Sequence, residues 1–227
     1  LLLFAGTVFA QQKATITGVP DIPFTSAPNF LKLPPGETLG ESVAVATNSK
    51  GHVFVYTRSQ DTRLFEFDPT GKFVREIGQG LYGFLFAHAV RVDKDDNIWA
   101  VDEGSNMVIK FNPEGRVTMV FGRKKEASDE AEPWTRVNPP RPAIDGQFRQ
   151  PTDVTWDPQG NIFVSDGYCN NRVVKYDKNG RFLAQNGSEK VGKGENEYNL
   201  PHGLQVDHAG NVYVADRGNA RYVVLDN

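Results

Sequence analysis

One short unit occurs four times in the chain, and this repetition constrains the fold more than any other feature. Each copy begins with a polar turn, with Asp or Asn first and Gly or Asp fourth, and continues with alternating apolar residues. The copies are NSKGHVFVYT from Asn48, DKDDNIWAVD from Asp93, DPQGNIFVSD from Asp157 and DHAGNVYVAD from Asp207. Alternation with a period of two after a tight turn predicts a β-strand.

Further strand-like segments flank each copy in the same order. An alternating stretch such as AVRVD precedes each turn, and hairpin segments with PTG, PEG and KNG at their turns follow the first three copies. Each unit therefore offers about four antiparallel strands, which is typical of propeller blades of about 40 to 50 residues. We expect an all-β propeller with about four blades in this chain.

The fourth unit bears on how many blades the complete ring contains. The fourth unit stops at Asn227 in mid-hairpin, without an outer strand to protect its edge. We expect the natural protein to continue past Asn227 and to complete a ring of six blades. The alternative is a four-bladed ring that is closed by the N-terminal segment from Lys13 to Leu33.

Outside the repeats, the chain divides into three further segments. Residues 1–12, LLLFAGTVFAQQ, resemble the apolar core and cleavage site of a secretory signal and predict a secreted or periplasmic protein, although a disordered terminus or a buried first strand would also fit. Residues 13–40 form an N-terminal segment that could supply a closing strand to the propeller at 41–227. Within the propeller, residues 122–147 form a Pro-rich, charged insertion, read as an exposed loop rather than a lid.

Charge and cysteine content narrow the classes of partner. The formal net charge is -3, from 25 Lys plus Arg and 28 Asp plus Glu, so neither nucleic acid nor a membrane surface is a favoured partner. The first apolar run is too short to span a membrane. Cys169 is the one cysteine, which precludes an intrachain disulfide. We expect a monomer that binds a small molecule.

Two histidines occupy one column of the repeat. His88 and His202 each stand five residues before the turn aspartate, in the second and fourth units, where the others have Val43 and Thr152. This column begins the innermost strand of a blade, so we expect both imidazoles to face one central channel. A third histidine from a sixth blade would complete a set that suits catalytic zinc. A satisfied polar core histidine is the alternative for each residue taken alone.

A second column lies at the end of the following strand. It brings Arg58, Tyr168 and Arg217 to neighbouring positions, which we expect at the channel mouth. The arginines could bind a carboxylate, and a tyrosine beside a divalent cation and two guanidinium groups could lose its proton more easily than a free phenol. These residues predict a site for an anionic substrate. The aspartates of this column are expected to brace turns between blades: Asp102, Asp166 and Asp216.

The segments QPTDVTWDPQGNIFVSDGYCNNRVVKYDKNGRF and LPHGLQVDHAGNVYVADRGNAR resemble the NHL-repeat propellers, and specifically the peptidyl-α-hydroxyglycine α-amidating lyases. The resemblance runs from about Gly40 to Asn227. It implies a six-bladed propeller with three zinc-binding histidines and a structural calcium held by backbone carbonyls. His88 and His202 match two zinc ligands, with the third beyond Asn227. Val45 and Val90 match two calcium donors.

The same resemblance assigns Arg58, Tyr168 and Arg217 to the active site and implies a zinc-dependent lyase. Such an enzyme cleaves the C–N bond of a peptidyl-α-hydroxyglycine-like substrate to a peptide amide and glyoxylate. Two departures stand out: Arg149 replaces a cysteine that pairs with the Cys169 position in animal members, and FAHAV replaces PHGL around His88. The alternatives are a non-catalytic NHL propeller that binds a protein or peptide, and a metal-dependent lactonase, whose Glu, Asn and Asp ligands the histidine column does not supply.

Overall fold

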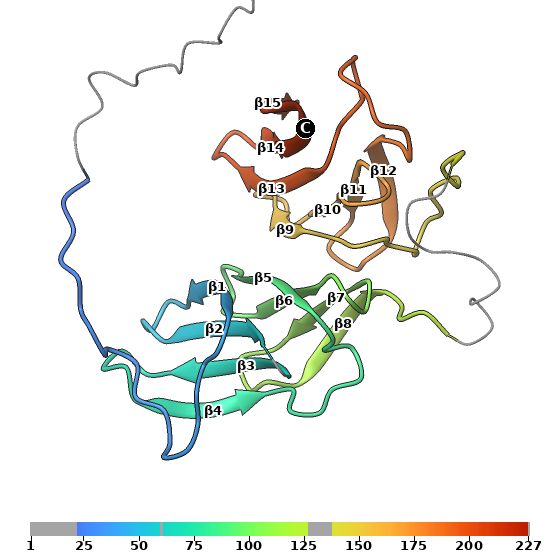
Figure 1. Ribbon diagram of the computed structural model, residues 1–227. Helices are drawn as coiled ribbons and strands as arrows, with labels where there is room; N and C mark the ends of the chain where they lie inside the picture. Colours follow the sequence, from blue (N-terminus) through green and yellow to red (C-terminus); the bar gives the residue numbers. More distant parts are fainter. Residues whose placement is uncertain (1–21, 60, 127–137, 227) are drawn as a thin grey trace, which may run out of the picture. The chain divides into compact units, whose positions relative to one another are not determined.

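The computed structural model describes residues 22–59, 61–126 and 138–226 (Figure 1). Their regular structure is almost entirely antiparallel β-sheet, with one short 3-10 turn at Arg217–Asn219. The expected all-β class is therefore confirmed. No helix in these three ranges is long and apolar enough to cross a membrane.

Four sheets follow one another along the chain, each built from strands that are consecutive in sequence. The first contains β1 (Ser42–Thr47), β2 (Val53–Arg58), β3 (Thr62–Phe67) and β4 (Phe73–Ile77). The second contains β5 (Ala87–Val92), β6 (Ile98–Asp102), β7 (Met107–Phe111) and β8 (Val117–Gly122). The third contains β9 (Asp153–Trp156), β10 (Ile162–Asp166), β11 (Arg172–Tyr176) and β12 (Phe182–Gly187). The fourth contains β13 (Pro201–Val206), β14 (Val212–Asp216) and β15 (Arg221–Leu225).

The repeated turn owes its shape to its first residue. The Asp93 carboxylate accepts hydrogen bonds from the backbone N–H groups of Asp95 and Asn97, which closes an Asx-type turn between β5 and β6. Asp207 repeats the arrangement with Ala209 and Asn211 in the fourth sheet. An Asn or Asp at this position thus aligns the first two strands of each unit, which is why the sequence repeats so clearly here.

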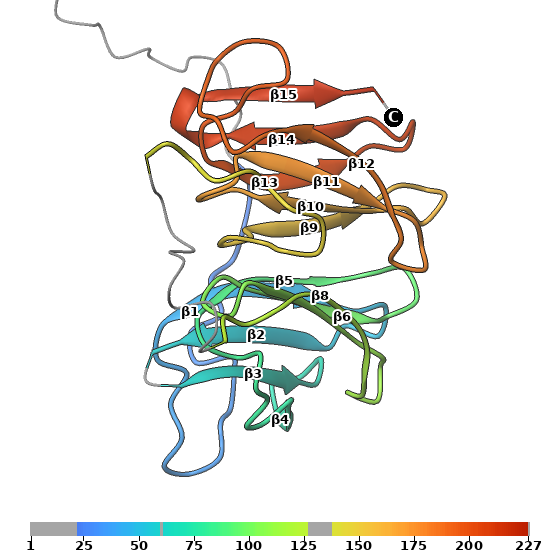
Figure 2. The same cartoon turned by 90° about the vertical axis from the view of Figure 1, so that its right-hand side faces the viewer.

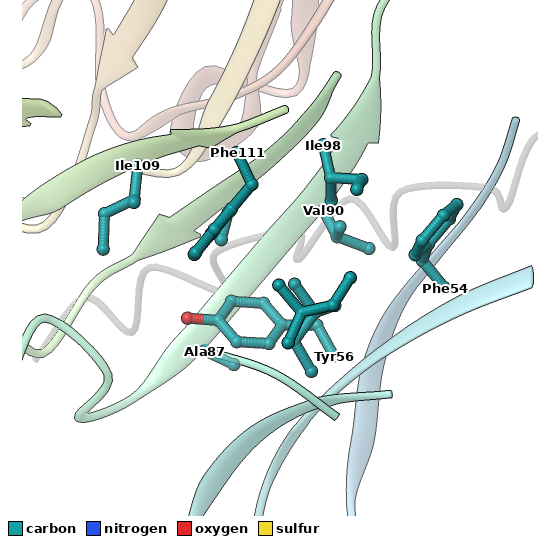
Figure 3. Packing of buried hydrophobic residues seen from close by; sticks show 10 residues of the cluster. Phe54, Tyr56, Ala87, Val90, Ile98, Ile109 and Phe111 are labelled. Atoms are coloured by element: carbon teal, nitrogen blue, oxygen red, sulfur yellow. The ribbon is translucent and has the colours of Figure 1, made fainter. Parts of the chain in front are cut away.

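The first strands of the four sheets lie side by side, β1 next to β5, β5 next to β9 and β9 next to β13 (Figure 2). Apolar side chains fill the space between neighbouring sheets. Between the first two, Phe54 and Tyr56 of β2 meet side chains of the second sheet that are similarly buried (Figure 3). Full burial of such a side chain contributes roughly 1.5–3 kcal/mol. The partners from the second sheet are Ala87, Val90, Ile98, Ile109 and Phe111.

The described residues 22–30 belong to a first unit, and the residues from Leu31 onward belong to a second. In the second unit, Leu31, Leu33 and Leu39 pack against the first sheet. Lys32 forms an isolated β-bridge with Lys72, the one bridge that the described part of 13–40 makes. The predicted signal at 1–12 lies outside the described residues, as do residues 13–21 of the segment that was expected to supply a closing strand.

The predicted insertion at 122–147 is described at its two ends, and residues 127–137 lie outside the described ranges. After the end of β8, the described residues 123–126 and 138–147 contain no strand. Its C-terminal end is fastened to the third sheet, because the buried Arg172 donates to the carbonyl oxygens of Ile144 and Gln147. Arg149 donates in the same way to the carbonyl of Arg141.

Candidate functional site

His88 and His202 both lie at irregularities in their strands. In β5 the register shifts between Ala87 and Ala89, and in β13 it shifts between Pro201 and Leu204. Because a β-bulge re-aims the side chain of its extra residue, each histidine leaves the regular alternation of its strand. The sequence column identified the two positions, whereas the bulges that aim the side chains were not predicted.

An aspartate on the intervening strand holds the two histidine strands together. The Asp153 carboxylate in β9 accepts hydrogen bonds of 2.9 and 2.6 Å from Arg91 of β5. It also accepts the backbone N–H of Leu204 in β13, at 2.9 Å. Asp153 is buried, so these charge-assisted bonds fix the separation of the strands that carry His88 and His202.

The two imidazoles and Tyr168 form one compact cluster. The ring centres of His88 and His202 lie 4.7 Å apart, and the Tyr168 hydroxyl lies 3.3 Å from the Nε2 atom of each. The Nδ1 atom of His88 lies 2.7 Å from the carbonyl oxygen of Thr152, which accepts only, so Nδ1 carries the proton of neutral His88 and its Nε2 atom is an acceptor. The Tyr168 hydroxyl can donate its proton to the Nε2 atom of His88, and it lies equally close to the Nε2 atom of His202. The Nε2 atoms of both imidazoles therefore lie around one phenol oxygen.

Burial sets the protonation of this cluster. It lowers the pKa of His88 to about 4, with a further contribution from the charge of His202. Burial also lowers the pKa of His202, followed by the charge of Arg217. Both imidazoles are neutral at pH 7, the form that binds metals.

The pKa of Tyr168 is set by burial and by the charges of its neighbours. Burial and the negative charge of Glu103 raise its pKa above the ordinary phenol value, and they outweigh the charges of Arg217 and Arg58 and a hydrogen bond from Arg217. The sequence-based expectation included a divalent cation beside the phenol, and it stays a prediction. The protein groups alone shift the pKa in the opposite direction.

Arg58 and Arg217 reach the cluster from different sheets. The charge of Arg58 acts on His88 and Tyr168, and its Nε and Nη2 atoms donate to Glu41 at 2.9 and 2.8 Å. Arg217 follows β14 and is exposed, with its backbone N–H bonded to the carbonyl of Leu200. The structure thus brings together His88, His202, Tyr168, Arg58 and Arg217, as the sequence predicted.

Glu103 is the site residue that sequence reasoning missed. Its carboxylate lies 3.8 Å from the Nε2 atom of His88 and accepts a hydrogen bond from Gln150 at 3.2 Å. Burial raises its pKa. Gln150 also accepts from the thiol of Cys169, so these side chains line one edge of the cluster. In the sequence, the only signal for Glu103 was its carboxylate directly after Asp102, at the end of the strand.

The aspartates at the end of the second strand of three sheets have the bracing role that was expected. Asp102 accepts the backbone N–H groups of Leu85 and Phe86, both at 2.9 Å, just ahead of β5. Asp166 accepts the N–H of Arg149 and Asp216 that of Asn199, both at 2.7 Å, in the equivalent places. All three side chains are buried, so their carboxylates fasten the chain that enters each first strand.

The donor set fits part of a zinc site. Two neutral imidazoles whose Nε2 atoms lie around the same point suit two of the four ligand positions of one zinc ion. In ranges 22–59, 61–126 and 138–226, no group of three or more His, Cys, Asp and Glu side chains has an arrangement that could hold a metal. Val45 pairs with Val55 and Val90 with Ala100, which are equivalent register positions, but calcium binding by their carbonyls stays a prediction.

Comparison with known proteins identifies one repeat directly. The NHL repeat model matches residues 148–176, which contain β9, β10 and β11. This chain carries an NHL repeat. The solved structures that it resembles support the propeller fold: a streptogramin B lyase structure superposes with a TM-score of 0.59 over 87% of this chain and 54% of that one, at 13% identity. A Bacteroides thetaiotaomicron protein of unknown function gives 0.58 over 82% and 48%, at 17% identity.

The curated relatives of this NHL-repeat chain carry two kinds of name. Peptidyl-glycine alpha-amidating monooxygenase B of Xenopus laevis is 32% identical over 77% of this chain, which spans 19% of that protein. A probable peptidyl-alpha-hydroxyglycine alpha-amidating lyase of Caenorhabditis elegans is 28% identical over 82% of this chain and 56% of its own length. Human NHL repeat-containing protein 3 is also 28% identical, over 82% of this chain and 52% of its own length.

Proposed function

We propose that this NHL-repeat chain carries the active site of a carbon-nitrogen lyase that converts a peptidyl-α-hydroxyglycine-like substrate to a peptide amide and glyoxylate. One observation carries the proposal: the Tyr168 hydroxyl lies 3.3 Å from both histidine Nε2 atoms, with two arginine charges acting on it. Relatives named as amidating lyases, at 28–30% identity, support the same reaction class.

The charges of the site suit such a substrate. Its carboxylate would bind Arg58 or Arg217, whose guanidinium groups are the cations that act on Tyr168. A substrate bound in this way would have its α-hydroxyl, two bonds from the carboxylate carbon, near the cluster formed by Tyr168 and the two imidazoles. His88 and His202 would hold zinc, and zinc when bound supplies the charge that makes a nearby hydroxyl and phenol more acidic. A structural calcium at Val45 and Val90 belongs to the same proposal.

The reaction then needs one proton to move and one bond to break. The phenolate form of Tyr168 takes the α-hydroxyl proton as general base. The oxygen lone pair forms the C=O bond of glyoxylate, and the electrons of the C–N bond go to the amide nitrogen. That nitrogen receives the proton, so Tyr168 returns to its starting state and no water is consumed. Because burial and Glu103 raise the pKa of the phenol, the wild-type enzyme should lose activity at low pH.

The proposal is tested by replacing the phenol. With zinc and an α-hydroxyhippurate-type substrate, Tyr168→Phe should lower kcat about 100-fold or more, the usual loss for a general base. Tyr213→Phe is the matched control, because the Tyr213 hydroxyl bonds Asp207 in a repeat turn, and it should retain the wild-type rate. Equal glyoxylate release by Tyr168→Phe and wild type would refute the assignment of the base.

A binding function without catalysis is the second candidate. It is kept because the similarity to NHL repeat-containing protein 3, whose name states no activity, covers 82% of this chain, the same share as the similarity to the nematode lyase. A binding module would release no glyoxylate from any α-hydroxyglycine substrate, with or without zinc, which separates the two candidates in one assay.

A further inference from the structure

Two exposed apolar side chains stand next to the candidate site. Leu85 and Phe86, which we call the apolar lip, precede β5 and remain 47% and 41% exposed. Their backbone is nevertheless rigidly held, because both N–H groups donate to the buried Asp102 and the Phe86 carbonyl accepts the N–H of Glu103 at 3.0 Å. Gly104 packs directly against the Cβ atoms of both residues. The lip is a fixed surface and not a loose loop.

The lip adjoins the charged part of the site. The guanidinium carbon of Arg58 lies 4.6 Å from the centre of the Phe86 ring, and His88 follows Phe86 by two residues. The charge of Arg58 also acts on Tyr168 and Glu103. If a ligand binds Arg58 through its carboxylate, the part of the ligand beyond the carboxylate would therefore lie close to the exposed ring of Phe86.

This juxtaposition points to the kind of molecule that fits. A fixed pair of exposed apolar side chains beside a cation suits a ligand with an anionic end and an apolar neighbour. A charged side chain in this place would lose hydration against Leu85 without gaining the burial of apolar surface.

We propose that the lip selects substrates in which the residue before the α-hydroxyglycine unit has an apolar, preferably aromatic, side chain that packs on Leu85 and Phe86. This inference rests on the proposed lyase function and adds the substrate class. A single apolar contact in a binding site discriminates by about 10-fold or more in kcat/KM. The protein should therefore prefer a Phe-α-hydroxyglycine substrate to the Ser analogue by about that factor.

The test compares kcat/KM for N-acyl-Phe-α-hydroxyglycine and N-acyl-Ser-α-hydroxyglycine in the wild type and in variants. In Leu85→Ser/Phe86→Ser the ratio should fall toward one, and serine keeps the Cβ atoms that pack on Gly104. Leu85→Ser alone preserves the contact of Phe86 with Arg58 and should lower the ratio in part. Leu183→Ser, on a 50% exposed leucine of β12, should keep the wild-type ratio.

Two outcomes would overturn the inference: a wild-type ratio near one, or an unchanged ratio in the double variant with a wild-type circular dichroism spectrum. Either result, with glyoxylate released, would leave the lyase function standing. If neither substrate is turned over, calorimetric titration with the unhydroxylated peptides N-acyl-Phe-Gly and N-acyl-Ser-Gly decides. If N-acyl-Phe-Gly binds about 10-fold more tightly than N-acyl-Ser-Gly and the double variant loses this difference, the proposed role of the lip is supported. Equal binding of the two peptides refutes it.

Discussion

Arg172 offers the sharpest test of how the third sheet is stabilised. Its side chain and that of Asp166 are both 0% exposed, and its Nε atom donates to the carboxylate at 3.0 Å. The remaining donors reach Gln185 at 2.8 Å and the carbonyls of Ile144 and Gln147. Replacement by methionine would remove all of these bonds and leave a buried carboxylate without its cation. Breaking such a pair from one side costs about 3–5 kcal/mol of unfolding free energy.

The fourth sheet supplies a matched control. Arg221 makes the equivalent bond to Asp216 at 2.7 Å, but 33% of its side chain is exposed to solvent. Asp216 is buried, but water reaches the Arg221 side chain and can replace part of what it provides, so Arg221→Met should cost less than Arg172→Met, about 1–3 kcal/mol. Urea unfolding at pH 7, followed by tryptophan fluorescence, measures both free energies. Equal losses in the two variants, or a loss below about 1 kcal/mol for Arg172→Met, would refute the argument.

The loss of unfolding free energy in Arg172→Met should depend on pH. Burial raises the pKa of Asp166 in the folded protein, while Arg172 lowers it, so Arg172→Met raises that pKa further. A carboxyl whose pKa is higher when folded binds more protons in the folded state and stabilises it below that pKa. The destabilisation should therefore shrink as the pH falls from 7 toward 4. A constant difference between variant and wild type over this range would contradict the assignment.

Two further predictions concern the cluster around Tyr168. A Cβ atom at Gly167 would overlap the carbonyl oxygen of Pro201, so Gly167→Ala should destabilise the protein by about 1–3 kcal/mol and lower turnover. Gly203→Ala, where the nearest atom is 3.8 Å from the new Cβ, should unfold in urea like the wild type, and equal effects would count against this packing. Glu103→Gln should lower the pKa of Tyr168, followed by NMR of labelled tyrosine, and an unchanged pKa would show that Glu103 does not act on the phenol.

The repeats predicted the architecture because the same local rule operates in every unit. The Asx-type turn at Asp93 and the alternation after it depend on neighbouring residues only, so the strands could be located from the sequence. The histidine column predicted the contact between the two imidazoles for a related reason. Equivalent positions in equivalent blades meet at the inner strands, and His88 and His202 lie in contact as expected.

The remainder of the site depends on contacts that no repeat encodes. Glu103 follows Asp102, the partner of Ala87 across β5 and β6, and it comes close to His88 where the bulge re-aims the imidazole. Its charge raises the pKa of Tyr168, against the charges of the two arginines. The lip at Phe86 is set by the buried carboxylate of Asp102, which the sequence marked only as a brace. Burial and long-range charge are tertiary properties, so sequence spacing could not predict them.

Product analysis tests the central claim most directly. The wild-type protein with zinc should release amide and glyoxylate in a one-to-one ratio from an N-acyl-α-hydroxyglycine, measured by chromatography and mass spectrometry. The His88→Ala/His202→Ala variant should bind less zinc by elemental analysis and form neither product above the uncatalysed rate. Absence of both products with the zinc-loaded wild type, or equal formation by the double variant, would contradict the assignment of this site as a lyase centre.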